Sequence, residues 1–320
     1  MLRYRTFRNT DPPLVCALWR SRAGQCGFVQ PVSVALLEQL VFGKLHFDYE
    51  GLILALDDGR PAGFAHASFG PDERQTAISR ATGVICVVCV RPDCAEAEVA
   101  AGLVERCEEY LRLRGAEVVY GGAVRPRSPF YLGLYGGCDL AGVLDSDLVA
   151  GSAFRARGFQ EAGRTAILRR ELNGFRLAPD RQQVQFRRRM MVQVIVDPAA
   201  RTWWEACTTG DFDLTLFELL PRGGGEPLAR AVVRAMDLAN GLASGRAAGV
   251  IELEVEPQHR RQGLATFLLA EAIRVLAGQG VAVVEAQTDE GDAAGIALFG
   301  KLGFRTIGHG TIYRKGLEDR

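Results

Sequence analysis

The sequence predicts an α/β protein built from two similar domains, and three observations carry that prediction. The chain has 320 residues, more than one hydrophobic core usually organises, so two domains are expected. Apolar runs typical of strands alternate with stretches in which apolar residues recur every three or four positions, as in amphipathic helices. The order strand, proline turn, helix, glycine, strand occurs twice, and Pro257 lies 165 residues after Pro92.

Each half contains the same expected elements. Strands are predicted over 51–56, 62–69, 82–90 and 117–120 in the first half, and over 212–220, 227–236, 249–255 and 281–285 in the second. Between the last two strands of each half, regularly spaced apolar residues define one buried helix face: Val99, Leu103, Cys107, Tyr110 and Leu111, then Leu264, Leu268, Ala272, Ile273 and Leu276. A short helix ending at Gly158 or Gly303 follows.

We place the domain boundary near residues 171–179, which gives a first domain of 1–172 and a second of 173–320. The two halves differ in one length. Pro92 and Phe159 are 67 residues apart, whereas Pro257 and Phe304 are 47 apart, a difference of 20. The excess lies in the glycine-rich stretch 131–150, which is predicted to be a surface insertion.

Charge and hydropathy exclude several classes of protein. Lys+Arg and Asp+Glu are both 38, so whole-chain basicity gives no reason to expect a nucleic acid or an anionic membrane as partner. No apolar run reaches the roughly 18 residues of a membrane helix. The N-terminal residues lack the apolar core of a signal peptide. A cytoplasmic protein is therefore expected.

The cysteines give little reason to expect a metal. Cys86 and Cys89 form the one close pair, and they lie in an apolar run that is predicted to be a strand. Residues three apart on a strand point to opposite faces, so the two thiols would not share one ion. We expect both to be buried and reduced, and no metal site.

The sharpest local motif runs from Val255 to Thr266, where a strand ends, a basic turn follows and a helix begins. Such a helix start offers free backbone N–H groups and the positive end of the helix dipole. Gly263 and Ala265 keep side chains small there, while Arg260 and Arg261 add positive charge. The motif therefore predicts a diphosphate site. The alternative is an arginine-rich helix terminus on the surface.

With its surroundings, this motif resembles the GNAT N-acetyltransferase superfamily. The resemblance covers the strand, the loop Arg260-x-x-Gly263-x-Ala265, the helix and the tail 297–304. It implies two GNAT-like domains, each a mixed, splayed β-sheet with helices on both faces. The pantetheine arm of acetyl-coenzyme A would lie in the gap between strands 251–255 and 281–285. The resemblance implies these coenzyme-binding residues: Leu253, Glu254, Val255, Arg260, Arg261, Gln262, Gly263, Leu264, Ala265, Thr266, Asp292 and Phe299.

The sequence departs from the family pattern at several positions. Asp292 stands where the family usually has Asn, and Gly295 where it has Ala. Phe299 replaces a Tyr that often protonates the leaving thiolate, and phenylalanine has no proton to give. Gly249 stands where several members carry a basic Glu. Coenzyme binding is therefore better supported than any catalytic role, and a non-catalytic coenzyme-binding or sensor protein is the alternative.

The first half resembles the same family more faintly. Aligning the two prolines places Ala95–Ala100 over Arg260–Ala265. Both arginines are then missing, and Glu96 and Glu98 lie where they would repel a diphosphate. We expect a retired coenzyme site in this half. Tandem members such as mycothiol synthase show the same division between a working and a non-working half.

The resemblance implies direct transfer of the acetyl group of acetyl-coenzyme A to an amine of a small molecule or peptide. A base is needed because the amine is mostly charged at neutral pH. The candidates are Glu285, Glu252 and Glu254, with Glu285 slightly favoured. The alternatives are that these are solvated strand glutamates and that water removes the proton.

Other residues receive structural interpretations. Trp203 and Trp204 are expected to serve packing rather than the acceptor, and His259 to be a surface loop residue, while His309 is left undecided. The insertion 131–150 either covers the acceptor cleft or forms a structural Ω-loop. The duplication mimics a dimer, so a monomer is expected.

Overall fold

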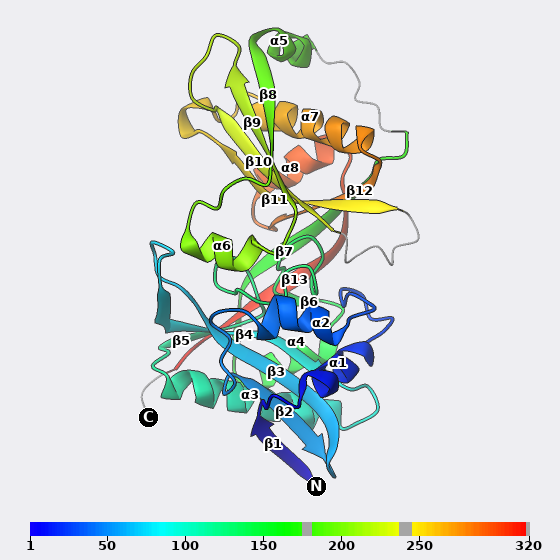
Figure 1. Ribbon diagram of the computed structural model, residues 1–320, viewed down its shortest axis with the longest axis vertical. Helices are drawn as coiled ribbons and strands as arrows, with labels where there is room; N and C mark the ends of the chain where they lie inside the picture. Colours follow the sequence, from blue (N-terminus) through cyan, green and yellow to red (C-terminus); the bar gives the residue numbers. More distant parts are fainter. Residues whose placement is uncertain (175–180, 237–244, 318–320) are drawn as a thin grey trace. The chain divides into compact units, whose positions relative to one another are not determined.

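The computed structural model describes residues 1–174, 181–236 and 245–317 (Figure 1). The chain forms two compact units. Unit 1 consists of Met1–Thr165, Ala200–Asp211 and Gly308–Arg320, and unit 2 of Ala166–Ala199 and Phe212–Ile307. This division differs from the predicted one at 172/173, because two segments of the second half of the chain pack in unit 1.

Unit 1 contains a mixed sheet with the strand order β1-β2-β3-β4-β5, followed by residues of β13 and β7. Its strands are β1 (Leu2–Thr6), β2 (Leu52–Asp57), β3 (Arg60–Pro71), β4 (Ile78–Val90), β5 (Val118–Gly121), β6 (Val143–Leu144) and parts of β7 (Gln160–Glu171) and β13 (Arg305–Gly316). Its helical segments are α1 (Pro12–Arg20), α2 (Val34–Leu37), the π-helical turn η1 (Glu38–Phe42), α3 (Glu96–Leu113), α4 (Leu148–Ala156) and α6 (Trp203–Thr209).

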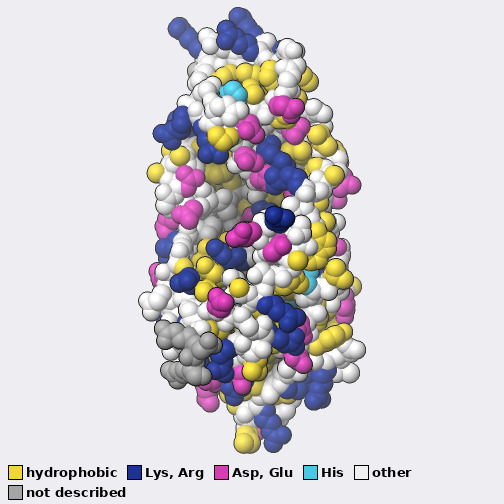
Figure 2. Space-filling view, turned by 90° about the vertical axis from the view of Figure 1, so that its left-hand side faces the viewer, with side chains coloured by type: hydrophobic (Ala, Val, Ile, Leu, Met, Phe, Trp, Pro, Cys, Tyr) yellow, Lys and Arg dark blue, Asp and Glu magenta, His cyan; other side chains and the backbone are white. Residues whose placement is uncertain are grey.

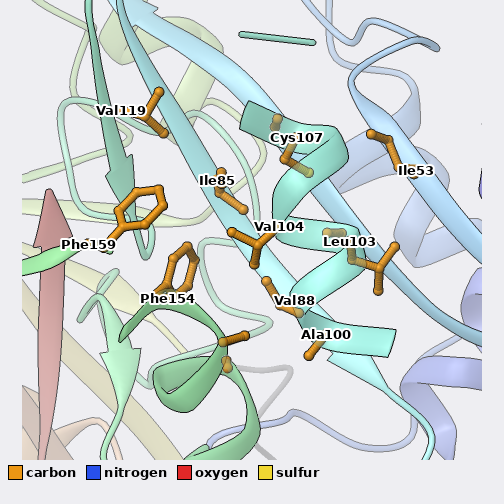
Figure 3. Close-up of a cluster of buried hydrophobic side chains, with 14 of the residues drawn as sticks. Ile53, Ile85, Val88, Ala100, Leu103, Val104, Cys107, Val119, Phe154 and Phe159 are labelled. Carbon is orange, nitrogen blue, oxygen red and sulfur yellow. The ribbon is translucent and has the colours of Figure 1, made fainter. Parts of the chain in front are cut away.

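The main core of unit 1 lies between the sheet and the helices α3 and α4. Figure 3 shows Leu103 and Val104 of α3 and Phe154 of α4 against Ile85 of β4. Burying one such side chain stabilises the fold by about 1.5–3 kcal/mol, so this layer is a main source of stability. The helix α1 packs on β3 and β4 from the other face. Helices therefore cover both faces of this sheet, as predicted.

Unit 2 repeats this plan, with the strand order β7-β12-β11-β10-β9-β8. Its strands are β8 (Met190–Val196), β9 (Leu214–Pro221), β10 (Ala229–Ala235), β11 (Arg246–Val255) and β12 (Val281–Asp289), together with the rest of β7. Its helices are α5 (Arg181–Arg189), the 3₁₀ turn η3 (Pro257–His259), α7 (Leu264–Gly278) and α8 (Ala293–Lys301). Leu268 and Ile273 of α7 are fully buried in its core. The expected α/β fold with mixed strand pairing in both units is confirmed, although the strands of the two units belong to one 13-stranded sheet and not to two separate sheets.

In each unit one parallel pair of strands diverges at the same place in the repeat. The β4–β5 ladder ends at Ile85↔Gly121, although β4 continues to Val90. The β11–β12 ladder ends at Val250↔Ala286, although β11 continues to Val255. Ile85 and Val250 are 165 residues apart, the same offset that separates Pro92 from Pro257, so the predicted splay occurs at equivalent positions of the two repeats.

A β-bulge lies directly beyond the last parallel pair in each unit. His66 and Ala67 of β3 face Val87 and Ile85, so Cys86 is the extra residue. The adjacent residues Val232 and Val233 of β10 face Glu252 and Val250, which leaves Ile251 as the extra residue of β11. A bulge bends its strand and increases the local twist. It therefore accounts for the divergence of β4 and β11 from their parallel partners.

The thiols of Cys86 and Cys89 are buried and free, as expected. Burial raises the pKa of the Cys86 thiol to about 11, so the thiol is protonated at neutral pH. Residues 1–174, 181–236 and 245–317 contain no group of three or more His, Cys, Asp or Glu side chains placed to hold a metal. Within the same ranges, no helix has both the length and the apolar character that a bilayer-spanning segment requires.

Candidate functional site

The predicted diphosphate motif forms a strand–turn–helix in unit 2. The strand β11 ends at Val255, η3 follows, and Gly263 caps the N-terminus of α7 with a φ of +85°. Glycine adopts this left-handed conformation without steric cost. Among the described residues, no side chain caps α7. Its first-turn N–H groups have no acceptor within the helix and suit an oxyanion.

The two arginines of this loop have different settings. Arg260 is exposed, and its Nε donates to the carbonyl of Val255 at 3.0 Å. Arg261 is also exposed and has a φ of +62°, which is uncommon for a residue with a side chain. Leu264 is buried, whereas Ala265 and Thr266 are half-buried. The loop therefore presents cations and backbone donors at one helix terminus.

One contact to this loop comes from a residue that the sequence reasoning missed. Gln182 of α5 donates from its Nε2 to the carbonyl of Gln262 at 2.9 Å. Its amide nitrogen lies 3.2 Å from the position that a Cβ on Gly263 would take. The helix α5 was not predicted, because it is short and strongly polar and none of its residues is buried.

The end of β11 provides the predicted place for the pantetheine arm. Leu253 and Val255 pair with β10 and pack against the core of unit 2. Glu254 lies between them and is exposed. These three residues lie beyond Val250, the last residue of β11 that pairs with β12 in the described ladder. The side of their backbone that faces β12 therefore does not take part in that ladder. An extended chain that enters such a gap could hydrogen-bond to that strand edge.

The structure places the two predicted tail residues in structural roles. Asp292 caps α8, and its Oδ1 accepts from the backbone N–H groups of Ala294 at 3.1 Å and Gly295 at 3.0 Å. Phe299 is buried in the core, where its ring lies 5.2 Å from that of Phe304. Asp292 therefore fixes the start of α8, and Phe299 packs the end of the same helix against the core.

Glu285 is buried and paired with an arginine that the sequence did not indicate. Its Oε1 lies 2.6 Å from Nη2 and 3.0 Å from Nε of Arg169 on β7. Glu285 is 2% exposed and pairs in the ladder with Gly249, one residue before the splay. Since a lone charge at such a site is very unfavourable, Arg169 is needed to hold this carboxylate there.

The other two candidate carboxylates lie on β11 beyond the splay. Glu252 is half-buried and forms an ion pair with Arg230 of β10 at 3.0 Å. Glu254 stands directly opposite Arg230 in the β10–β11 ladder. Both glutamates alternate with Leu253 and Val255, so they project from the face opposite α7. The structure thus brings Glu252 and Glu254 together on one charged face.

The corresponding face in unit 1 is apolar and aromatic. His66 pairs with Val87 in the β3–β4 ladder of unit 1. The equivalent pair in the β10–β11 ladder of unit 2 is Val232 with Glu252. By the same registers, Phe64 and Cys89 stand at the positions of Arg230 and Glu254, and Tyr120 stands at that of Glu285. The charged set is therefore specific to unit 2.

In unit 1 the place that corresponds to the coenzyme loop contains the chain's own side chains. Arg22 is 8% exposed, and its Nη1 donates to the carbonyl of Val90 at 2.9 Å. Its guanidinium also lies 3.5 Å from Glu96 and 3.7 Å from Asp147. Burial raises the pKa of Asp147, and the charge of Arg22 opposes that rise. This arrangement supports the interpretation of a retired site.

The prediction that 131–150 is a surface insertion is wrong. Tyr131 and Tyr135 are both nearly inaccessible, and the ring of Tyr131 stacks on Trp19 with a centroid distance of 5.7 Å. The hydroxyl of Tyr135 donates to Asp147 at 3.2 Å and accepts from the N–H of Leu144 at 3.0 Å. The segment is thus part of the interior of unit 1, and its aromatic content was the signal that could have revealed this.

The tryptophans and histidines singled out in the sequence differ in how far they are buried. Trp204 is 1% exposed and donates from Nε1 to the carbonyl of Pro126 at 2.6 Å, which confirms a packing role, whereas Trp203 is 37% exposed. His259 and His309 are half-buried. Burial lowers the pKa of His66, which lies in unit 1, to about 3.

Comparison with known proteins agrees with this architecture. The sequence model of the acetyltransferase (GNAT) family matches residues 20–135 and 184–304, which is more than half of the chain. Both units therefore carry a match of their own. The sequence matches no curated protein.

Solved structures of low sequence identity share the fold. A tandem GNAT protein from the clavulanic acid biosynthesis pathway, solved without acetyl-coenzyme A, has a TM-score of 0.66 at 14% identity over 100% of both chains. A GCN5-related N-acetyltransferase from Sphaerobacter thermophilus has a TM-score of 0.66 at 15% identity over 99% of this chain and 96% of that chain. A glucosamine N-acetyltransferase region of a fungal multi-domain β-N-acetylglucosaminidase gives 0.72 at 17% identity over 98% of this chain, which spans only 38% of that protein.

Proposed function

Because the chain belongs to the acetyltransferase (GNAT) family, we propose that unit 2 binds acetyl-coenzyme A and transfers its acetyl group to an amine of a small molecule or peptide. The observation that carries the proposal is the loop of Arg260 and Arg261 with the left-handed Gly263 at the start of α7. Backbone N–H groups at such a terminus and nearby cations are what a diphosphate requires.

In this proposal the backbone of Leu253–Val255 binds the pantetheine arm at the divergent end of β11. The amine nitrogen attacks the thioester carbonyl carbon, so that the C–N bond forms as the C–S bond breaks. The amine proton goes to a base and the thiolate leaves with the coenzyme. Glu285 is the favoured base because it lies one residue before the splay, with Glu252 and Glu254 as the other candidates.

A second function, coenzyme binding without transfer, is favoured by Phe299. This side chain lies in the core of unit 2 and carries no hydroxyl that could protonate a thiolate. A binding or sensor protein would need the diphosphate loop but not the carboxylates. The two functions therefore differ in turnover and not in affinity for the coenzyme.

The test is release of free coenzyme thiol from acetyl-coenzyme A in the presence of amines, aminoglycosides, amino acids and peptides. The chain has eight free cysteines, of which Cys26 is exposed and Cys94 and Cys207 are half-buried, so only release beyond eight equivalents per chain counts as turnover. Amine-dependent multiple turnover that is lost on Gly263→Asp supports transfer. Tight coenzyme binding without turnover on any amine supports the second function.

A further inference from the structure

The strand β8 ends the strand order of unit 2, so one of its edges has no strand partner within residues 1–174, 181–236 and 245–317. On its other edge, the N–H of Arg222 donates to the carbonyl of Arg189 at 2.8 Å. The N–H of Asp197 donates to the carbonyl of Leu214 at 3.0 Å. Since hydrogen-bonded pairs alternate in an antiparallel ladder, the odd-numbered residues of β8 bond to β9. The even-numbered residues turn their N–H and C=O groups to the free edge: Met190, Val192, Val194 and Val196.

The helix α5, which leads into β8, packs on one face of the sheet and not beside this free edge. The ring of its Phe186 lies 5.4 Å from that of Phe267 on α7, and its Arg187 forms an ion pair with Glu271 of α7 at 2.8 Å. In Figure 2, Lys and Arg side chains gather at the top of the view, the level at which Figure 1 shows α5. These contacts place α5 over the face that α7 covers.

The strands β1 and β8, which begin the two units and lie at opposite ends of the strand order, differ in charge. β1 has two arginines among its five residues. Charged side chains on an edge strand disfavour pairing with another chain. β8 has no charged residue among its seven, and Met191, Val194 and Val196 are 45%, 41% and 76% exposed. The free edge of β8 therefore lacks the protection that β1 has, and it presents apolar side chains to solvent.

The sequence of β8 is complementary to itself when two copies of the strand run antiparallel. If Gln193 stands opposite Gln193 of the second copy, outward-facing residues stand opposite outward-facing residues, so that their N–H and C=O groups can bond across the pair. Residues opposite each other in an antiparallel pair have side chains on the same face. In this register all such pairs besides the central one are apolar: Met190 with Val196, Met191 with Ile195, and Val192 with Val194.

The charges that flank β8 agree with this register. Arg189 directly precedes the strand and Asp197 directly follows it, and both are exposed. Because both are equally far from Gln193, Arg189 of one copy stands opposite Asp197 of the other at each end of the pair. An axis through Val194 would instead place Arg189 opposite Ala199. Charge complementarity therefore favours the antiparallel pair with Gln193 at its centre.

We propose that the free edge of β8 is a dimerisation surface, on which β8 of a second copy of this chain pairs antiparallel with Gln193 on the two-fold axis. A second copy supplies a bonding partner for each outward N–H and C=O group, apolar partners on both faces and an opposite charge at each end. The proposal replaces the monomer that the duplication led us to expect. Seven residues of strand are about 24 Å long, so the interface is small and the dimer is reversible, with a Kd of about 10–100 µM.

Cysteine substitution in the full chain tests the register. In Gln193→Cys the two introduced thiols face each other across the axis, at a Cα separation of about 4.5 Å that a disulfide can span. In Met191→Cys the two introduced thiols lie about 14 Å apart, because each stands opposite Ile195 of the other copy.

Under mild oxidation, Gln193→Cys should form a covalent dimer at least about 10-fold faster than Met191→Cys, as measured by non-reducing electrophoresis. The unchanged chain gives the background from the exposed Cys26. Equal rates for the two variants would overturn the proposal.

Sedimentation equilibrium measures the dimer without a cross-link, and a matched pair of variants tests its charged ends. Arg189→Asp places two carboxylates opposite each other at both ends and should raise the Kd about 10-fold, whereas Arg189→Asn should raise it about 3-fold. Adding Asp197→Asn to Arg189→Asp removes the repulsion and should restore much of the affinity. Asparagine suits this position, since Asp197 has a φ of +53°. Equal effects of Arg189→Asp and Arg189→Asn, or an unchanged chain that stays monomeric up to about 200 µM, would contradict the proposal.

Discussion

The splayed strand pairs of the two units share one backbone plan and differ in the side chains around it. In unit 2, Arg260 donates to the carbonyl of Val255 from within the diphosphate loop. In unit 1, the equivalent carbonyl of Val90 accepts from Arg22, which comes from the turn after α1. A guanidinium thus meets the strand end in both units, but only in unit 2 does it belong to a loop with the left-handed Gly263.

The comparison shows that both units have the bulge and the splay, although the charged residues beside the opening in unit 2 are absent from the equivalent positions of unit 1. Cys86 and Ile251 are extra residues at equivalent places, and both parallel ladders end there. The opening in the sheet is therefore a property of the backbone. The two units differ in the charges beside the opening, and the predictions below change those charges in one structural unit and at the equivalent place in the other.

The largest effect is expected for the proposed base. Glu285→Gln keeps the side-chain shape and should lower kcat about 10²–10⁴-fold at neutral pH, with partial recovery as the pH rises and more amine is neutral. Tyr120→Phe changes the equivalent position of unit 1 and should leave kcat unchanged. Steady-state kinetics and coenzyme calorimetry measure both variants. If Glu285→Gln, Glu252→Gln and Glu254→Gln all keep their activity, no carboxylate of this set is the base.

Next comes the diphosphate loop. Gly263→Asp and Gly263→Asn introduce side chains of similar size, and both residues tolerate a left-handed backbone conformation. Only the aspartate brings a negative charge close to the diphosphate. The aspartate should weaken acetyl-coenzyme A binding about 100-fold, and the asparagine about 10-fold or less. Glu98→Gly, the matching change in unit 1, should leave the affinity unchanged. Calorimetry should give one site per chain, and two sites of similar affinity would contradict the retired half.

The third prediction concerns Arg22 and Asp147, the buried charges at the place in unit 1 that corresponds to the diphosphate loop. Arg22→Ala leaves Asp147 buried without its cation, which should lower the free energy of unfolding of unit 1 by about 3 kcal/mol. Adding Asp147→Asn removes the uncompensated charge and should restore much of the loss. The three tryptophans, Trp19, Trp203 and Trp204, all lie in unit 1, so urea unfolding followed by their fluorescence reports this unit. A double variant less stable than the single one would contradict this account.

The smallest effect is a pH dependence that distinguishes unit 1. Burial lowers the pKa of His66 to about 3 and that of His46 to about 4, both below the ordinary value of 6.5. Between pH 6.5 and 4 the unfolded chain binds protons that the folded unit does not, so stability falls as the pH falls. At pH 5.5 the loss is about 1.4 kcal/mol per histidine relative to neutral pH. Tryptophan-monitored unfolding that does not change between pH 7.5 and 5.5 would contradict neutral histidines.

Much of the fold could be predicted from local patterns. Alternating apolar runs and helix periodicity located β4, β5, α3, β11, α7 and β12, and the turn after β11 identified the loop. Arg169 and Arg22 could not be assigned in the same way. Each is one arginine among many in the sequence, and only the sheet register and the tertiary fold bring it beside its buried carboxylate. The stretch 131–150 combines glycine turns, which favour a surface loop, with Tyr131 and Tyr135, which the tertiary fold buries.

The course of β13 has a consequence for synthesis of the chain. Residues 313–316 pair with β5, and 310–311 pair with β6, so they complete the sheet of unit 1 although they lie near the C-terminus. The N-terminal unit therefore cannot close its sheet while these residues are still in the ribosomal exit tunnel. A nascent chain that has emerged only as far as residue 172 exposes the unpaired edge of β5, which is covered only after residues 313–316 have emerged.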